Sequence, residues 1–220
     1  RRYHYRIVFE ECATTLYDER SFGNIFRALG DVVKALWILH RAGWVHRDIS
    51  GGNVYWYDNG IRRTGLLGDF EYARAQTDST LHDVRTGTPF FMAAETLCQR
   101  YLFQDQDLKE HMGSCDTSVP FFYNPLHDLE SVWWIIIYVT FFNDDSTSLS
   151  VAPTKRQTAM ESLFHGSLDF TERLLFLKDP EGLREARHYL SSTFDKALDL
   201  LDEFRRNLKT AYLDSEKPYP

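Results

Sequence analysis

Apolar residues recur every three or four positions over residues 22–40, which predicts an amphipathic helix with one wide buried face. Ser21 precedes this stretch as a possible N-cap, and Gly43 follows it as a residue that can end a helix. The apolar positions are Phe22, Ile25, Phe26, Leu29, Val32, Val33, Leu36, Trp37 and Leu39. We expect this helix to pack its apolar side against the core.

A hairpin is predicted immediately after residue 53. The apolar segments 54–57 and 66–67 flank Asp58-Asn59-Gly60, and Asn-Gly accepts the positive φ angles of a type I′ turn. Such a hairpin would bring Asn53 and Asp69 to the same end of two paired strands.

The second half of the chain is predicted to be helical. The apolar run 132–142 has too few residues to span a bilayer, so we expect a buried core helix. Helical periods also cover 158–164, 170–177 and, most clearly, 183–212. In the last of these one face carries Leu190, Phe194, Leu198, Leu201, Phe204 and Leu208, and we expect it to face the core rather than a partner.

Two segments lack a clear period. Residues 71–94 are rich in hydroxyl side chains and are expected to form a loop, and a loop of this length inside a compact domain is usually functional or disordered. Between Cys98 and Pro125 the composition turns polar, which indicates an insertion.

Composition narrows the class of protein. The 220 residues are 43% hydrophobic, which suits one globular domain. The net charge is -7 and the basic residues are scattered, so a nucleic-acid or membrane partner is not expected. Three cysteines without a C-x-x-C spacing favour a reducing, intracellular compartment, cytoplasm or nucleus. The chain starts without the apolar segment of a secretory signal.

Candidate chemistry is concentrated in residues 46–53. His46, Arg47, Asp48 and Asn53 form an H-R-D-x4-N motif, a combination that is rare by chance, and Asp69-Phe70 follows it. This places two carboxylates and an amide at spacings suited to phosphoryl transfer.

Further landmarks follow in order: the segment 87–95, which reads G-T-P-F-F-M-A-A-E, and Asp128-Leu129-Glu130-Ser131 at the start of the apolar run. With the segment 6–12, which predicts a strand over residues 5–9 ending at Glu10-Glu11, these motifs resemble the eukaryotic protein kinases, and among them the fungal-type protein kinase domain family. The resemblance covers about the first 145 residues.

The resemblance implies a mainly α fold with small β-hairpins, the large C-terminal lobe of a protein kinase. The N-terminal lobe is expected to be absent, because only nine residues precede Glu10 and the chain has neither a G-x-G-x-x-G loop nor a V-A-I-K strand. The implied parts are a last strand and hinge (1–16), catalytic and activation segments (46–95), an insertion (98–125) and C-terminal helices (146–220).

The resemblance also implies roles for individual residues. Asp48 would accept the proton of the substrate hydroxyl, and Asn53 and Asp69 would hold Mg²⁺ at the phosphates of ATP. Glu10 and Cys12, in the hinge, would contact ATP.

Around this centre, Arg47 and Ser50 belong to the catalytic motif, and Arg47 could pair with a phosphate on the activation segment. Within that segment, Thr86 is the favoured phosphate acceptor, ahead of Thr80, and Thr88 would hydrogen-bond Asp48.

Three further residues, His46, Glu95 and Asp128, are expected to support the motifs structurally. Departures from the common kinase pattern are Ser50 in place of a lysine, Glu71 in place of the glycine of D-F-G, and Ala94 in place of the proline of A-P-E.

The leading hypothesis is therefore an ATP-dependent kinase of protein Ser/Thr hydroxyls, with ATP and a protein substrate as partners and Mg²⁺ as cofactor. As a C-lobe fragment the chain is expected to be inactive alone. Two alternatives stay open: a small-molecule phosphotransferase of the same superfamily, whose D-x-E resembles Asp69-Phe70-Glu71, and a non-catalytic partner-binding module.

Overall fold

The computed structural model describes residues 8–78, 87–103, 121–142, 152–164, 169–190 and 194–216. The strands are β1 (Thr14–Thr15), β2 (Trp44–Val45), β3 (Val54–Asp58), β4 (Arg63–Leu67) and β5 (Arg74–Ala75). The helices are α1 (Phe22–Arg41), α2 (Ala94–Cys98), α3 (Pro125–Phe142), α4 (Ala152–Leu163), α5 (Thr171–Lys178), α6 (Glu181–Ala186) and α7 (Asp195–Ser215), with a 3₁₀ turn at Phe70–Tyr72. A mainly helical fold with small antiparallel sheets is thus confirmed.

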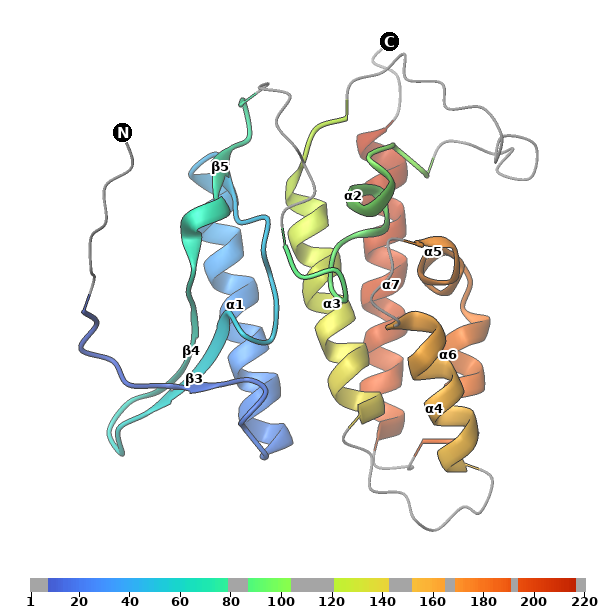
Figure 1. Ribbon diagram of the computed structural model, residues 1–220, viewed down its shortest axis with the longest axis horizontal. Helices are drawn as coiled ribbons and strands as arrows, with labels where there is room; N and C mark the ends of the chain where they lie inside the picture. The colour runs from blue at the N-terminus through green and yellow to red at the C-terminus, as the bar shows by residue number, and fades with distance from the viewer. Residues whose placement is uncertain are drawn as a thin grey trace.

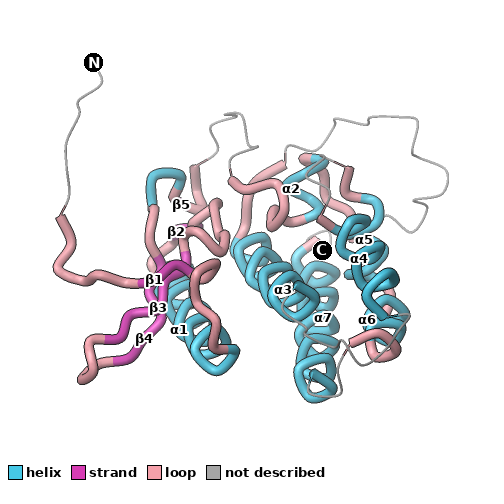
Figure 2. Tube along the Cα trace, turned by 60° about the horizontal axis from the view of Figure 1, so that its bottom comes forward, coloured by secondary structure: helices cyan, strands magenta, loops and turns pink. Residues whose placement is uncertain are grey.

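The strands lie on one side of the molecule, beside α1 (Figure 1). They form an antiparallel sheet in the order β1-β3-β4 and a separate β2-β5 pair. Helix α3 lies next to α1 and also packs against α7, and α2, α4, α5 and α6 surround the far side of this pair (Figures 1 and 2).

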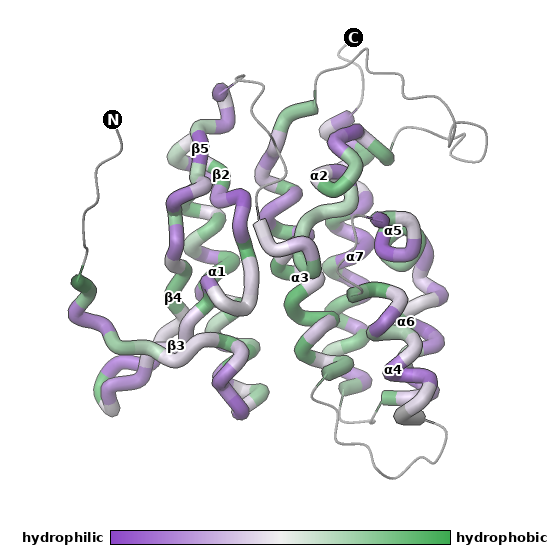
Figure 3. The backbone as a smooth tube through the Cα atoms, viewed as in Figure 1, coloured by the Kyte–Doolittle hydropathy of each residue, from purple (hydrophilic) through white to green (hydrophobic). Residues whose placement is uncertain are grey.

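Helix α3 is the centre of the core. Buried side chains occur all around it, including Trp133, Trp134 and Ile135, and its tube is coloured largely hydrophobic beyond its first turn in Figure 3. The indole of Trp133 donates to the carbonyl of Leu201 in α7, at 3.0 Å. The predicted buried helix is confirmed, and it begins earlier, at Pro125, where the missing N–H of proline needs no partner. Within the described residues, no helix is both long enough and apolar enough to cross a membrane.

Helix α1 is also confirmed, although its buried side is narrower than predicted. Val33 and Trp37 are 36% and 60% exposed, so they do not belong to the buried face. Ser21 occupies the N-cap position, but its side chain makes no capping hydrogen bond. Gly43 follows the C-cap with a φ of 82°.

The hairpin of β3 and β4 forms as predicted, but the turn type is wrong. Asp58 pairs with Arg63, which leaves a four-residue loop rather than a two-residue type I′ turn. Only Gly60 of this loop has a positive φ. The side-chain oxygen of Asn59 accepts hydrogen bonds from the backbone N–H groups of Ile61 and Arg62, which stabilises the longer loop.

Some short elements differ from the sequence predictions. Most of the strand predicted at 5–9 lies outside the described residues. Its last two residues, Val8 and Phe9, are exposed and are not in a strand. The first strand of the described residues is β1, which pairs with β3. The segment 71–94 is not all loop, because β5 pairs with β2.

The predicted insertion at 98–125 is described only at its edges, since residues 104–120 lie outside the described part. Those edges belong to the core, because Leu102, Phe103 and Phe121 are buried. Their polar neighbours in the sequence obscured this.

The single long helix predicted over 183–212 is two helices, α6 and α7. Tyr189 and Leu190 are buried just beyond the end of α6 rather than along one continuous helix face. Buried residues in a turn can therefore imitate a helical period. The apolar face predicted for the second part does face the core, as Leu198, Leu201 and Leu208 are buried.

Candidate active site

The motif loop (residues 46–53) connects β2 to β3 and is held by a buried carboxylate of α3. Asp128 accepts hydrogen bonds from the backbone N–H of His46 at 2.8 Å and of Arg47 at 2.9 Å. The side chains of Tyr123 and His40 also bond to Asp128, at 3.1 and 2.9 Å. These four hydrogen bonds offset the cost of removing the Asp128 carboxylate from water. Two of them hold the first two residues of the motif loop in place.

His46 connects the motif loop to the end of β4. Its Nδ1 accepts the backbone N–H of Asp48 at 3.3 Å, which leaves Nε2 to donate to the carbonyl of Gly68 at 3.0 Å. Burial lowers the pKa of His46, in agreement with this neutral tautomer. The ring also makes an edge contact with Phe70, with centroids 4.8 Å apart.

The carboxylate of Asp48 is bound on both of its oxygens. Oδ1 accepts the backbone N–H of Thr88 at 3.1 Å, with the Thr88 hydroxyl at 3.4 Å, and Oδ2 accepts the side-chain N–H of Asn53 at 3.1 Å. Gly87, with a φ of 119°, allows this approach, because a Cβ there would lie 3.0 Å from the carbonyl oxygen of Arg47. Two segments 40 residues apart therefore orient one carboxylate.

Asn53 and Asp69 lie at the same end of the hairpin. The backbone N–H of Gly68 donates to the carbonyl of Asn53 at 3.0 Å, and the exposed Asp69 follows directly. Because the amide nitrogen of Asn53 donates to Asp48, its side-chain oxygen remains for another ligand. A carboxylate and an amide oxygen are hard ligands, which suit Mg²⁺ bound jointly with substrate phosphates.

Two residues of this region adopt strained backbone angles. Arg47 has a φ of 74° and Asp69 a φ of 60°, in the left-handed region that non-glycine residues rarely occupy. Such conformations cost about 1–3 kcal/mol and cluster at functional sites. Arg47 directly precedes Asp48, and Asp69 lies at the hairpin end beside Asn53, so both residues belong to the candidate site.

The other predicted site residues are placed as follows. Ser50 is buried within the motif loop. Glu10 and Cys12 are exposed, and no hydrogen bond among the described residues joins Glu10 or Cys12 to the motif loop. Arg47 lies 5.7 Å from the ring of Tyr123, and burial lowers its pKa. Thr86, together with Thr80, lies outside the described residues.

Glu95, at the start of α2, is fully buried. Its carboxyl accepts the backbone N–H of Leu102 at 2.7 Å and contacts Nε2 of His127 at 3.0 Å. Nδ1 of His127 accepts the N–H of Asn124, so Nε2 carries the proton. Burial raises the pKa of Glu95 to about 7 and lowers that of His127 to about 4, so the imidazole is neutral at pH 7 and this contact is a hydrogen bond rather than an ion pair.

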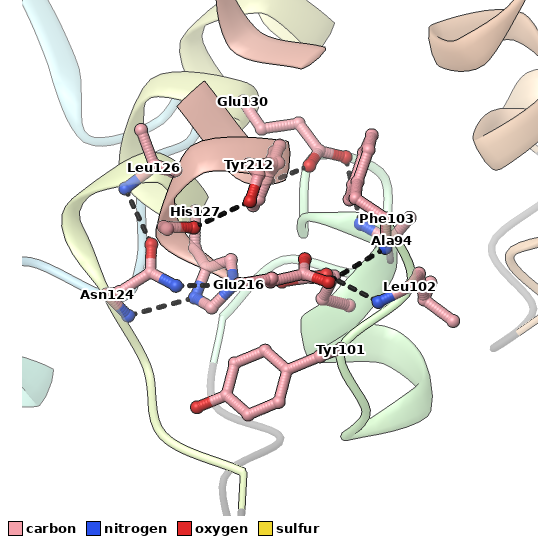
Figure 4. Close-up of polar contacts among 12 residues, drawn as sticks. Ala94, Tyr101, Leu102, Phe103, Asn124, Leu126, His127, Glu130, Tyr212 and Glu216 are labelled. Carbon is pink, nitrogen blue, oxygen red and sulfur yellow. Dashed lines mark hydrogen bonds and ion pairs between the residues drawn. The ribbon is translucent and has the colours of Figure 1, made fainter. Parts of the chain in front are cut away.

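A second buried carboxylate, Glu130, lies in the same cluster (Figure 4). It accepts hydrogen bonds from the N–H of Ala94 at 2.8 Å, the indole of Trp134 at 2.9 Å and the hydroxyl of Tyr212 at 2.7 Å. Glu216 joins from the end of α7 by accepting the N–H of Phe103 at 3.0 Å. This cluster fixes the start of α2 against α3 and α7.

Arg173 of α5 supports the segment that carries Thr88. Its guanidinium donates to the carbonyls of Pro89 at 2.9 Å and Met92 at 2.6 Å, and lies 4.4 Å from the ring of Trp134. The supporting roles of Glu130, Arg173 and Tyr212 could not be predicted from the sequence. A charged or hydroxyl residue within a helical period gives no sign of burial, although Glu130 does stand inside the recognised Asp128–Ser131 motif.

Comparison with known proteins places these motifs in one family. The fungal protein kinase family matches residues 1–140. Crinkler effector protein 8 of Phytophthora infestans is 56% identical over 34 residues, 16% of this chain and 6% of that protein. The probable serine/threonine-protein kinase zyg-1 of Caenorhabditis elegans is 36% identical over 89 residues, 38% of this chain and 12% of that protein.

Other similarities are also partial. Serine/threonine-protein kinase cst-1 of Caenorhabditis briggsae is 38% identical over 75 residues, 34% of this chain and 15% of that protein. A chain from the crystal structure of the yeast RNA Pol II CTD kinase CTDK-1 complex aligns with a TM-score of 0.41 and 16% identity, over 60% of this chain and 38% of that one. The chain thus matches only a small part of these curated relatives. With the family match extending over more than half of its length, the chain belongs to the fungal protein kinase family.

Proposed function

We propose that this chain carries the phosphoryl-transfer residues of an ATP-dependent protein kinase that acts on Ser/Thr hydroxyls. The observation that supports this most is the Asp48 carboxylate, whose two oxygens are oriented by Thr88 and Asn53. Each oxygen of a carboxylate can accept more than one hydrogen bond, so Asp48 can still receive the proton of an acceptor hydroxyl. Phosphoryl transfer needs mainly such positioning and charge neutralisation.

We infer that Asn53 and Asp69 hold Mg²⁺ when ATP is bound. Mg²⁺ usually uses one or two carboxylates together with phosphate oxygens, and the hairpin end offers one carboxylate and one amide oxygen. The ion would supply positive charge at the β- and γ-phosphates. Asp48, at a hydrogen-bonding distance from Asn53, would be the proton acceptor next to that ion.

The test compares Asp48→Ala with wild type in a phosphate-transfer assay on protein substrates, using the full-length protein. Loss of a general base should lower turnover about 10²- to 10⁴-fold. Asp58→Ala, on the exposed end of the same hairpin, is the matched control and should leave turnover within about twofold. Unchanged turnover in Asp48→Ala would exclude Asp48 as the base, and transfer to a small alcohol but to no protein would assign the site to small-molecule phosphotransferases.

Metal binding is tested separately. Mg-ATP should raise the melting temperature of the wild-type protein by mass action, and this increase should be lost in Asp69→Asn. The absence of any increase in the wild type would favour a non-catalytic role.

A further inference from the structure

Tyr17 lies against the motif loop, although it belongs to none of the kinase motifs. The preceding residue, Leu16, is buried, and its backbone N–H donates to the carbonyls of Gly51 at 3.2 Å and Val54 at 2.9 Å. These bonds fix the segment after β1 alongside the loop. Tyr17 itself is 48% exposed, so one side of its ring faces the loop and the rest stays open to solvent.

The ring of Tyr17 fills the space that a side chain at Gly51 would need, and it lies within contact distance of Gly52. A Cβ on Gly51 would lie 2.7 Å from Cε1 and 2.9 Å from Cζ of the ring, and a Cβ on Gly52 would lie 3.6 Å from Cε2. Burial raises the pKa of Tyr17, and Tyr138 and the charge of Asp48 raise it further, so the hydroxyl stays protonated.

The two glycines belong to the four residues that separate the proposed base, Asp48, from the proposed metal ligand, Asn53. Asn53 reaches back over them to bond with the carbonyl and the carboxylate of Asp48, at 3.0 and 3.1 Å. A pair of glycines is a flexible connection, so a side chain that packs on it restricts the conformations of its backbone. The Tyr17 ring provides such a contact.

We propose that Tyr17 is a positioning residue for phosphoryl transfer, which holds Gly51 and Gly52 so that Asp48 and Asn53 keep their mutual orientation. This inference rests on the proposed function. It predicts that Tyr17 affects the chemical step rather than the binding of ATP, because the ring contacts the loop between the two functional side chains.

The experiment is a double-mutant cycle in the full-length protein with Tyr17→Ala, Gly51→Ala and both changes together. Tyr17→Ala should lower kcat about 10- to 100-fold with the KM for ATP within about twofold, as expected when reacting groups are misplaced. Gly51→Ala should lower kcat similarly while the ring is present, and add less than about twofold once the ring is removed. Tyr57→Ala, a half-buried tyrosine of β3, is the matched control and should leave kcat within about twofold.

A second measurement does not depend on activity. In ¹H–¹⁵N spectra, the side-chain amide of Asn53 and the backbone amide of Thr88, both donors to Asp48, should shift in Tyr17→Ala but not in Tyr17→Phe, which keeps the ring, or in Tyr57→Ala. Unshifted signals, or an unchanged kcat in Tyr17→Ala, would overturn the inference. If the wild type transfers no phosphate, the proposed function fails, and the spectra still decide whether Tyr17 positions the loop.

Discussion

At the scale of single residues, Asp128 shows how a buried charge can organise a loop. Its carboxylate is fully buried and has four hydrogen-bond partners, two of which are backbone N–H groups of the motif loop. Backbone donors cannot turn away to find another acceptor. Asp128 therefore contributes to both the stability of the fold and the conformation of the site.

Replacing Asp128 by alanine should lower the free energy of unfolding by about 3 kcal/mol, because the N–H groups of His46 and Arg47 lose their acceptor. Urea unfolding of the purified chain measures this. Asp58→Ala is the control, since the Asp58–Arg63 ion pair is solvent-exposed and such pairs contribute about 1 kcal/mol or less. Equal effects of the two substitutions would contradict the bracing role of Asp128.

Glu95 should make stability depend on pH. Burial raises its pKa from 4.5 to about 7, so its contribution to stability is complete below pH 4.5 and is lost as the pH rises through 7. Glu95→Gln removes this titration. The wild type should therefore lose about 3 kcal/mol of stability between pH 4.5 and pH 8 that Glu95→Gln does not lose. The difference in free energy of unfolding, Glu95→Gln minus wild type, rises by that amount.

The opposing titration of His127 is present in both proteins and largely cancels in this difference. Its pKa is lowered to about 4, so it weakens the fold as the pH falls below 6.5. Other ionisable groups around Glu95 are Glu130, Glu216 and Lys178. Urea unfolding at four pH values gives the result, and a difference that is flat across the range would show that folding does not raise the pKa of Glu95.

At the scale of elements, the sequence predicted best where local patterns are long. Helix α1 follows from the apolar periodicity of residues 22–40, and α3 follows from the continuous apolar run 132–142. Two-residue strands such as β2 and β5 leave no such pattern, because only their pairing with each other defines them. The break between α6 and α7 was missed since buried residues at the turn continue the period.

Gly65 illustrates a packing requirement that no local pattern reveals. A Cβ on Gly65 of β4 would lie 2.4 Å from the carbonyl oxygen and 2.5 Å from the Cα of Ala28 in α1. Gly65→Ala should therefore force the hairpin away from α1 and lower the free energy of unfolding by about 3 kcal/mol.

Gly30 is the matched control within α1, because a Cβ there meets nothing within 4 Å. Gly30→Ala should instead raise the free energy of unfolding by up to about 1 kcal/mol through its higher helix propensity. Thermal or urea unfolding compares the two. A similar loss of stability for both would mean that the close packing of β4 on α1 is not the cause.

At the scale of the whole molecule, α3 connects the candidate site to the C-terminal helices. Asp128 and Glu130 are two positions apart, which is about 200° around the helix, so their carboxylates lie on opposite faces of α3. Asp128 bonds to the motif loop, and Glu130 bonds to Ala94 of α2 and Tyr212 of α7. The motifs around Asp48 could be recognised from the sequence, whereas the contact from Tyr212 to Glu130 spans 82 residues and could not.

This connection predicts a measurable coupling between α3 and α7. Tyr212→Phe removes the hydroxyl that donates to Glu130, and should lower the free energy of unfolding by about 2 kcal/mol because a buried carboxylate loses a donor. In the Glu130→Gln background the same change removes only a neutral hydrogen bond and should cost about 1 kcal/mol.

Tyr189→Phe, at another buried tyrosine, is the control and should cost less than about 0.5 kcal/mol. Strictly additive effects in this cycle would mean that the hydroxyl of Tyr212 does not act through Glu130. No loss in Tyr212→Phe would mean that Tyr212 stabilises α7 through its ring alone, stacked on Phe103.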